Sequence, residues 1–165
     1  GKLILAQQRH ADAAGTAALI SVLSEAGRTF FAHPMPRYTP IADPTGALLG
    51  SATPLIHTLA SAREMRIQGL PAGYVLTRGD HLGFAYGSSP TRYALHQIVT
   101  GGTADGSGIT PLIEVTPPIR PGAETGAEVQ LIRPAIKAIL IPGAGGTARP
   151  VVTGGVTVEF IQTLG

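Results

Sequence analysis

The sequence predicts a mainly β protein, an antiparallel β-sandwich or partly open barrel with one α-helix packed against it. Three observations support this prediction. Apolar and polar residues alternate along short segments after residue 55, turn-forming residues separate these segments, and only one segment has helical periodicity. A chain of 165 residues can bury one good core, so we expect a single β-rich domain over residues 1–165. Because the chain starts at Gly1 rather than Met, we also expect some N-terminal sequence to be missing.

The N-terminal part of the chain contains the one predicted helix. Residues 2–9 (KLILAQQR) predict a strand that is apolar at first and polar at its end. The helix is expected over about residues 12–26, with Asp12 as its N-cap and Gly27 at its end. The side chains expected to be buried against a sheet are Leu19, Ile20, Val22 and Leu23.

A short strand and an irregular connection follow the helix. Residues 29–33 (TFFAH) are aromatic and predict a strand. Residues 34–46 then bring four prolines within eleven positions. Proline donates no hydrogen bond to a sheet and biases the residue before it away from helix. We therefore expect a long surface connection here.

The rest of the chain predicts short antiparallel strands joined by tight turns. Turn sequences occur at 77–80 (TRGD), 87–90 (GSSP), 101–108 (GGTADGSG) and 120–127 (RPGAETGA). Residues 79–122 are thereby predicted to form a three-stranded meander. The apolar positions that alternate with polar ones are Met65 and Ile67, Ile113 and Val115, Val129 and Leu131, and Val156, Val158 and Phe160. The run 135–142 (AIKAILIP) is continuously apolar, which predicts a central strand covered on both faces.

The composition favours assembly with other proteins. Charged residues make up 13% of the chain, against about 25% in an average globular protein. A surface with so little charge indicates that part of it is covered by partners. The net charge of +2 is too small and too scattered to predict nucleic-acid binding. No apolar run approaches the roughly 18 residues of a membrane span, and the absence of cysteine excludes disulfides and cysteine-ligated metals.

No catalytic or metal-binding motif is recognisable. The five histidines have no ligand spacing, no GxSxG motif is present, and the glycine-rich runs lack the Lys-Ser/Thr of a P-loop. His96 is expected to be half-buried and hydrogen-bonded to a nearby carbonyl rather than to act as a base. The RGD tripeptide at 78–80 is interpreted as a turn before a strand. We therefore expect neither enzymatic activity nor a cofactor or metal.

Residues 73–141 resemble a known family. The order GYVLTRGDHLGFAY and then RYALHQIVTGGTADGSGITPLIEVTPPIRPGAETGAEVQLIRPAIKAIL is similar to minor tail proteins of long-tailed bacteriophages and related gene-transfer particles. Among these the sequence most resembles the distal tail proteins. The resemblance covers about two-thirds of the chain if the upstream strand, helix and proline-rich segment are included, and its motifs have low specificity because turn glycines and alternating strands recur in many β proteins.

The resemblance implies a structural role in a virion. Distal tail proteins have a β-sandwich-type domain with one helix and form a ring, usually of six copies, that joins the tail tube to the baseplate hub. It implies a chain located in the tail tip, assembled in the host cytoplasm, and in contact with its own copies, a tube protein and a hub protein, without membrane or specific nucleic acid. Residues 103–108 would extend along or into the tube. The candidate interface residues are Arg37, Tyr38, Asp105, Arg120 and Arg149.

Two alternatives to this role stay open. A glycan-binding β-sandwich module would present aromatic platforms on a concave sheet face, but the chain has only four Tyr, four Phe and no Trp. A hydrolase would need a site built from residues far apart in the sequence.

Overall fold

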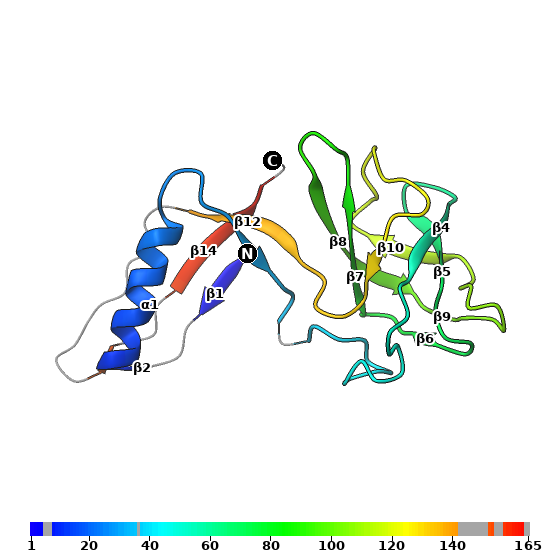
Figure 1. The fold of residues 1–165 in the computed structure, drawn as a ribbon, viewed down its shortest axis with the longest axis horizontal. Helices are drawn as coiled ribbons and strands as arrows, with labels where there is room; N and C mark the ends of the chain where they lie inside the picture. The colour runs from blue at the N-terminus through cyan, green and yellow to red at the C-terminus, as the bar shows by residue number, and fades with distance from the viewer. Residues whose placement is uncertain (5–7, 36, 142–151, 154–156, 164–165) are drawn as a thin grey trace. The chain divides into compact units, whose positions relative to one another are not determined.

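A computed structural model describes residues 1–4, 8–35, 37–141, 152–153 and 157–163 (Figure 1). The described chain is mainly β with one short helix and an almost closed antiparallel sheet, which confirms the predicted fold class. It forms two compact units. Unit 1 combines Gly1–Ala32 with Lys137–Thr163, and unit 2 spans His33–Ile136. Whether the two units fold together as one domain, as the length of the chain predicts, stays a prediction.

Unit 1 contains a four-stranded sheet, a helix and a small ribbon. The sheet has the strand order β1-β14-β12-β3, and β14 pairs antiparallel with both β1 and β12. The ribbon pairs β2 with β13, and α1 lies beside it. The strands β1 and β3 confirm the strands predicted at 2–9 and 29–33 in shorter form. The elements are β1 (Lys2–Ile4), β2 (Gln8–Arg9), α1 (His10–Leu23), β3 (Phe30–Ala32), β12 (Ile136–Leu140), β13 (Val152–Thr153) and β14 (Thr157–Gln162).

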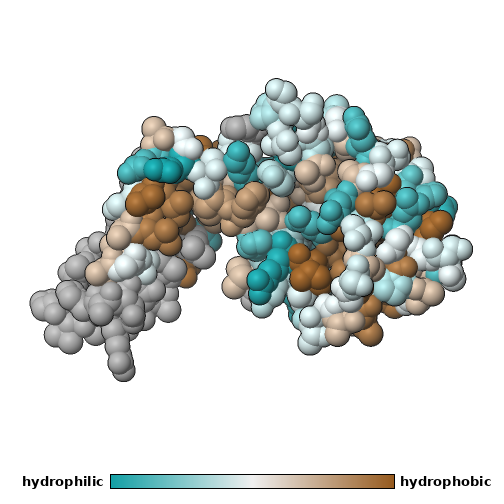
Figure 2. All heavy atoms as spheres, in the orientation of Figure 1, coloured by the Kyte–Doolittle hydropathy of each residue, from teal (hydrophilic) through white to brown (hydrophobic). Residues whose placement is uncertain are grey.

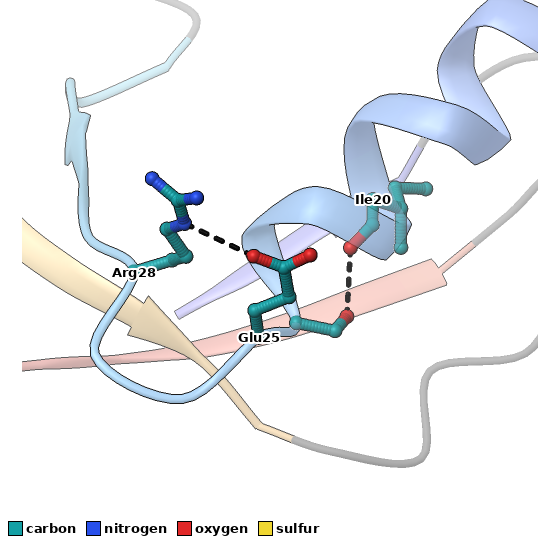
Figure 3. A network of polar contacts seen from close by, with 4 residues as sticks. Ile20, Glu25 and Arg28 are labelled. Atoms are coloured by element: carbon teal, nitrogen blue, oxygen red, sulfur yellow. Dashed lines mark hydrogen bonds and ion pairs between the residues drawn. The ribbon is translucent and has the colours of Figure 1, made fainter.

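The helix begins and ends earlier than predicted. It starts at His10, so Asp12 lies within the first turn instead of capping it. At the other end the Ser24 hydroxyl donates a hydrogen bond to the Ile20 carbonyl oxygen at 2.7 Å (Figure 3). The chain then turns through Gly27, whose φ of 81° is the left-handed conformation that glycine favours. The exposed pair Arg28–Glu25, with 3.2 Å between Nε and Oε2, lies in this turn (Figure 3).

The prediction that four apolar residues of α1 are buried against a sheet was wrong for two of them. Leu19 is 59% exposed and Val22 is 46% exposed, whereas Ile20 and Leu23 are half-buried. Ile20 and Leu23 are three residues apart and share one side of the helix, while Leu19 and Val22 share another. Helical periodicity identified the apolar positions, but it could not tell which side a neighbour covers.

The two faces of the unit 1 sheet differ in burial. Val158 and Ala138 are buried on one face, where the rings of Phe30 and Phe160 meet edge to face at 5.6 Å between centroids. The other face carries Ile139 and Ile161, which are direct partners across β12 and β14 and are 36% and 55% exposed. The run 135–142 therefore contains a central strand, as predicted, but the prediction that both its faces are covered was wrong.

Unit 2 is a six-stranded antiparallel barrel. Its strand order is β11-β7-β8-β10-β5-β4, and the neighbouring strands β7, β8 and β10 confirm the predicted meander. The two end strands of this order, β4 and β11, are also linked. Leu55 forms a bridge with Glu128, and the Ile56 N–H donates to the Ala127 carbonyl at 2.9 Å. The elements are β4 (Leu55–Leu59), β5 (Glu64–Gln68), β6 (Val75–Leu76), β7 (His81–Tyr86), β8 (Arg92–Thr100), β9 (Gly102–Thr103), β10 (Ile113–Thr116) and β11 (Val129–Gln130).

Alternation along the strands builds the core of the barrel. Met65 and Ile67 are fully buried between more exposed neighbours on β5, and β10 shows the same pattern. This confirms the predicted alternation in unit 2. On β14 the prediction holds for Val158, whereas Val156 lies outside the described residues. The fully buried large side chains of the barrel include Ile56, Met65, Ile67, Leu76, Leu82, Ile98, Ile113, Val115, Val129 and Leu131.

Candidate functional surfaces

Asp43 attaches the proline-rich connection to the barrel. Its carboxylate accepts hydrogen bonds from the N–H groups of Leu49 at 2.9 Å and Leu48 at 3.2 Å, and from the Tyr74 hydroxyl at 3.2 Å. Burial acts to raise the pKa of Asp43, but these hydrogen bonds together hold it below the ordinary value. Burial and the Asp43 charge raise the pKa of Tyr74 well above its ordinary range. Both groups are therefore held in one protonation state at neutral pH, which suits a structural role.

Asp80 closes the turn that contains the RGD tripeptide. It is 1% exposed, and its carboxylate accepts hydrogen bonds from the Ile41 N–H at 2.7 Å and from the N–H and hydroxyl of Thr77 at 2.7 and 2.9 Å. A buried carboxylate with three donors is not presented to a receptor. The interpretation of residues 78–80 as a turn before β7 is confirmed.

His96 lies inside the barrel rather than half-buried on its surface. It is 2% exposed, and its ring stacks on Phe84 with centroids 5.3 Å apart. Nδ1 is 2.7 Å from the Pro117 carbonyl oxygen, which can only accept, so Nδ1 holds the proton. The predicted hydrogen bond to a carbonyl is thus confirmed. Nε2 is buried without a hydrogen-bond partner among the described residues, and desolvation lowers the pKa of the ring.

The loop at 101–108 is held by bonds within the chain. Asp105 accepts hydrogen bonds from the N–H groups of Ser107 at 2.8 Å and Ile109 at 3.0 Å, and these bonds lower its pKa. The Gly73 N–H donates to the Ala104 carbonyl at 3.0 Å, which ties the loop to the segment before β6. Whether it contacts a tube stays a prediction.

Three of the other candidate interface residues, Arg37, Tyr38 and Arg120, lie on connections of unit 2. Arg37 and Arg120 are exposed, and Tyr38 is 40% exposed. The Arg133 guanidinium lies 5.4 Å from the centre of the Tyr38 ring, so this tyrosine already has a cationic neighbour in its own chain. Arg149 lies outside the described residues. Among the candidates, only Arg37 and Tyr38 are neighbours in the sequence, and the role of all five residues stays a prediction.

Two open depressions lie on the barrel. The first, about 260 Å³, is lined by buried Asp43 and Tyr74 and by the exposed side chains of Leu48 and Val75. The second, about 270 Å³, includes Tyr86 and Glu124 in its lining. Both are slightly smaller than the range of about 300 to 1,000 Å³ that is usual for small-molecule sites. Their linings are more apolar than polar, so they offer contact surface rather than a set of converging reactive groups.

The described histidines have different local partners. His33 Nδ1 is 2.9 Å from the Arg133 carbonyl oxygen, and His57 Nδ1 is 2.8 Å from the Thr58 hydroxyl. Within the described ranges no three His, Asp or Glu side chains are grouped to hold a metal ion. Among the same residues no helix has the length and apolar character needed to cross a bilayer.

Exposed apolar side chains are a surface feature that the sequence analysis did not predict. In unit 1 they lie on α1 and on one face of the sheet, and the space-filling view shows hydrophobic surface on this part of the chain (Figure 2). Apolar periodicity was visible in the sequence, but it signals burial, and only the fold shows which positions are left uncovered. The most exposed large apolar residues of unit 1 are Ile4, Leu19, Val22, Phe31, Ile139, Ile141 and Ile161.

Comparison of the chain with family models, with curated proteins and with solved structures gives no match. The likeness to distal tail proteins therefore stays a prediction. The structure shows a barrel whose buried carboxylates Asp43 and Asp80 are hydrogen-bonded, and a second unit with exposed apolar side chains. The most direct chemical use of such a surface is contact with another protein.

Proposed function

We propose that the chain is a structural subunit of a bacteriophage-type tail tip. In this role it forms a ring, with six copies as the expected number, that joins the tail tube to the baseplate hub. It acts in the virion tail after assembly in the host cytoplasm. Its partners are its own copies, a tube protein and a hub protein, and it uses no cofactor.

The exposed apolar surface of unit 1 is the observation that supports this proposal most. Among the described residues of this unit, seven large apolar side chains are at least 36% exposed. Isolated exposed apolar residues are normal, but a group of them on one small unit favours protein–protein contact. The order of strands and turns over residues 73–141 adds the resemblance to distal tail proteins.

The buried polar groups of unit 2 agree with a structural role. Asp43 and Asp80 each accept three hydrogen bonds, and these come from groups that hold turns and connections in place. The aromatic rings of Tyr74, Phe84 and Tyr86 are at most 5% exposed. These three rings cannot serve as platforms for a glycan without opening the core.

The proposal is tested by the assembly state of the full chain. We expect sedimentation velocity over a wide concentration range to reveal one closed oligomer, and negative-stain electron microscopy to show rings. In the particle, the protein should lie between tube and hub. A chain that stays monomeric at every concentration and makes no contact with its own copies in the intact particle would exclude the ring.

A further inference from the structure

The helix α1 has apolar residues on two sides, and only one side is covered. Ile20 and Leu23 are half-buried, whereas Gly15, Ala18, Leu19 and Val22 are exposed. The spacing i, i+3, i+4, i+7 places the four exposed residues in one stripe. A helix that is apolar on more than one side is normally buried on each of them. We call residues 15, 18, 19 and 22 the exposed stripe of α1.

The sheet of the same unit has an uncovered face made of isoleucines. Ile139 pairs with Ile161 across β12 and β14. Ile141 follows directly after β12, where its N–H still donates to the Glu159 carbonyl of β14 at 2.9 Å, so all three isoleucines point to one face. Lys2 is the register partner of Glu159, which shares that face with Ile161, and Ile4 lies two residues from Lys2 on β1, so Ile4 belongs there as well. Their exposed fractions are 70% for Ile4, 36% for Ile139, 41% for Ile141 and 55% for Ile161. These four residues form the isoleucine face.

The isoleucine face supplies part of the apolar area of a protein interface. Its four isoleucines are between 36% and 70% exposed. A standard interface buries about 800 Å² on each partner, of which roughly 450 Å² is apolar. The charges on the same face are Lys2 and Glu159, which lie directly opposite each other on β1 and β14, and Lys137, which lies two residues before Ile139 on β12. A partner that covers the isoleucines must therefore leave the Lys137 ammonium group at the rim of the contact, which the long lysine side chain can reach.

The two surfaces suit each other. Residues 14–23, which carry the exposed stripe, contain no charged side chain, so the stripe brings no charge onto the isoleucines. Gly15 and Ala18 are small and allow a close approach, while Leu19 and Val22 supply apolar contact area. A helix packed on a sheet is one of the standard layer arrangements of proteins. Since both surfaces belong to unit 1, every copy of the chain offers both.

We propose that the exposed stripe of α1 in one copy packs on the isoleucine face of the next copy. Such a contact is heterologous, because the two copies use different surfaces, and repeating it gives a ring when the rotation closes. This inference rests on the proposed ring function and identifies the surfaces that would form the ring contact.

Two charged substitutions and their mixture test the contact in the full chain. Leu19→Lys blocks the exposed stripe, and Ile161→Lys blocks the isoleucine face. We expect each variant alone to weaken assembly about thirtyfold or more, the effect of losing an interface hot spot. Mixed at equal concentration, the two variants should form a heterodimer, because the intact stripe of one fits the intact isoleucine face of the other. Light scattering after size-exclusion chromatography measures all three states.

Controls separate a lost contact from a lost fold. Met35→Lys places the same charge at a residue of unit 2 that is 72% exposed, and it should assemble like the original chain. Circular dichroism melting must show that each variant is folded. If Leu19→Lys or Ile161→Lys is unfolded, Val22→Lys and Ile4→Lys replace them, because both positions are exposed on the same surfaces.

Each remaining outcome decides against the inference in a different way. If the original chain forms rings and both variants form them equally well, this contact is wrong and the ring function stands. If Leu19→Lys still assembles while Ile161→Lys does not, the isoleucine faces pair with each other. If neither variant assembles and the mixture stays monomeric, the two surfaces are covered by something other than each other. If the original chain never assembles, the proposed function fails as well.

Discussion

Asp43 is the residue on which the proline-rich connection depends. The connection has few backbone hydrogen bonds of its own because proline lacks an N–H group. The Asp43 carboxylate compensates by accepting bonds from Leu48, Leu49 and Tyr74, which joins the connection to the barrel. A short Asp-Pro-Thr-Gly sequence predicts only a turn, so the distant partner Tyr74 was not predictable.

Replacing Asp43 should destabilise the barrel more than removing one of its donors. Asp43→Asn puts an amide where three donors converge, and we expect a loss of about 2–3 kcal/mol in the free energy of unfolding. Tyr74→Phe removes one bond and should cost about 1–2 kcal/mol. Urea denaturation measures both values, with exposed Glu128→Gln as the control that leaves stability nearly unchanged. Equal losses for the two variants would mean that the backbone bonds of Asp43 contribute little.

Because the pKa of Asp43 is lowered in the folded state, the free energy of unfolding should decrease at acidic pH. A carboxyl group whose pKa is lower in the folded state contributes its full stability above the pKa of the unfolded chain, about 4. That contribution is lost as the pH falls through the lower pKa of the folded state. Unfolding free energies measured from pH 5 downward should therefore decrease less steeply in Asp43→Asn than in the original chain. Parallel curves for the two proteins would contradict this assignment.

Protonation of His96 should make the free energy of unfolding depend on pH in a second range, above that of Asp43. Desolvation lowers its pKa in the folded state, with the Pro117 hydrogen bond opposing this in part, so the unfolded chain binds the proton first. Stability should be complete above the unfolded pKa of about 6.5 and should fall as the pH decreases toward the folded value. His96→Asn should reduce this slope in urea denaturation between pH 7 and 5.

His81 serves as a comparison for His96. Burial also lowers the pKa of His81, so His81→Asn added to His96→Asn should remove more of the slope. If His96→Asn has the same slope as the original chain, His96 does not control this part of the pH dependence.

At the scale of elements, the loop at 101–108 depends on close backbone packing. The α-hydrogen of Gly108 occupies the place where a Cβ would lie 2.2 Å from the Leu70 carbonyl oxygen, and the residue has a φ of 76°. Both features require glycine. Gly106 in the same loop has no atom within 4 Å of a Cβ position and offers a matched comparison.

Substituting the two glycines should therefore give different results. Gly108→Ala should lower the free energy of unfolding by at least about 2 kcal/mol, because it adds a clash to an unfavourable backbone conformation. Gly106→Ala should change it by less than about 1 kcal/mol. Thermal melting of both variants provides the measurement. Similar melting temperatures would show that the loop can move away from Leu70 without cost.

The strands and the helix differed in how well the sequence predicted them. Alternation placed Met65, Ile67 and Val115 in the core correctly, because in a closed barrel one face of every strand is buried whatever lies outside. The same logic failed for Leu19 and Ile139, because burial there depends on a neighbour outside the element. The turn at Asp80 and the hydrogen bond of His96 to a carbonyl were interpreted correctly from the sequence context. The deep burial of His96 and the Asp43–Tyr74 contact required knowledge of the tertiary structure.

For the whole molecule, the division into two units has a consequence for folding. The main apolar core, from Leu49 to Leu131, lies entirely within unit 2, whose described part, His33–Ile136, is continuous in sequence. Unit 1 is made from the two ends of the chain and has a less buried sheet. A continuous segment with its own core can fold alone, whereas a unit made from two distant segments depends on bringing them together.

We therefore expect residues 33–136 to fold as an isolated fragment. Its urea transition should be cooperative, and its amide protons on β5, β7 and β8 should be protected from exchange. In the full chain, unit 1 should unfold first, which would produce two transitions when signals from α1 and from the barrel are followed separately. If the fragment is unfolded and the full chain shows one transition by both signals, residues 1–165 fold as the single domain that the length of the chain predicted.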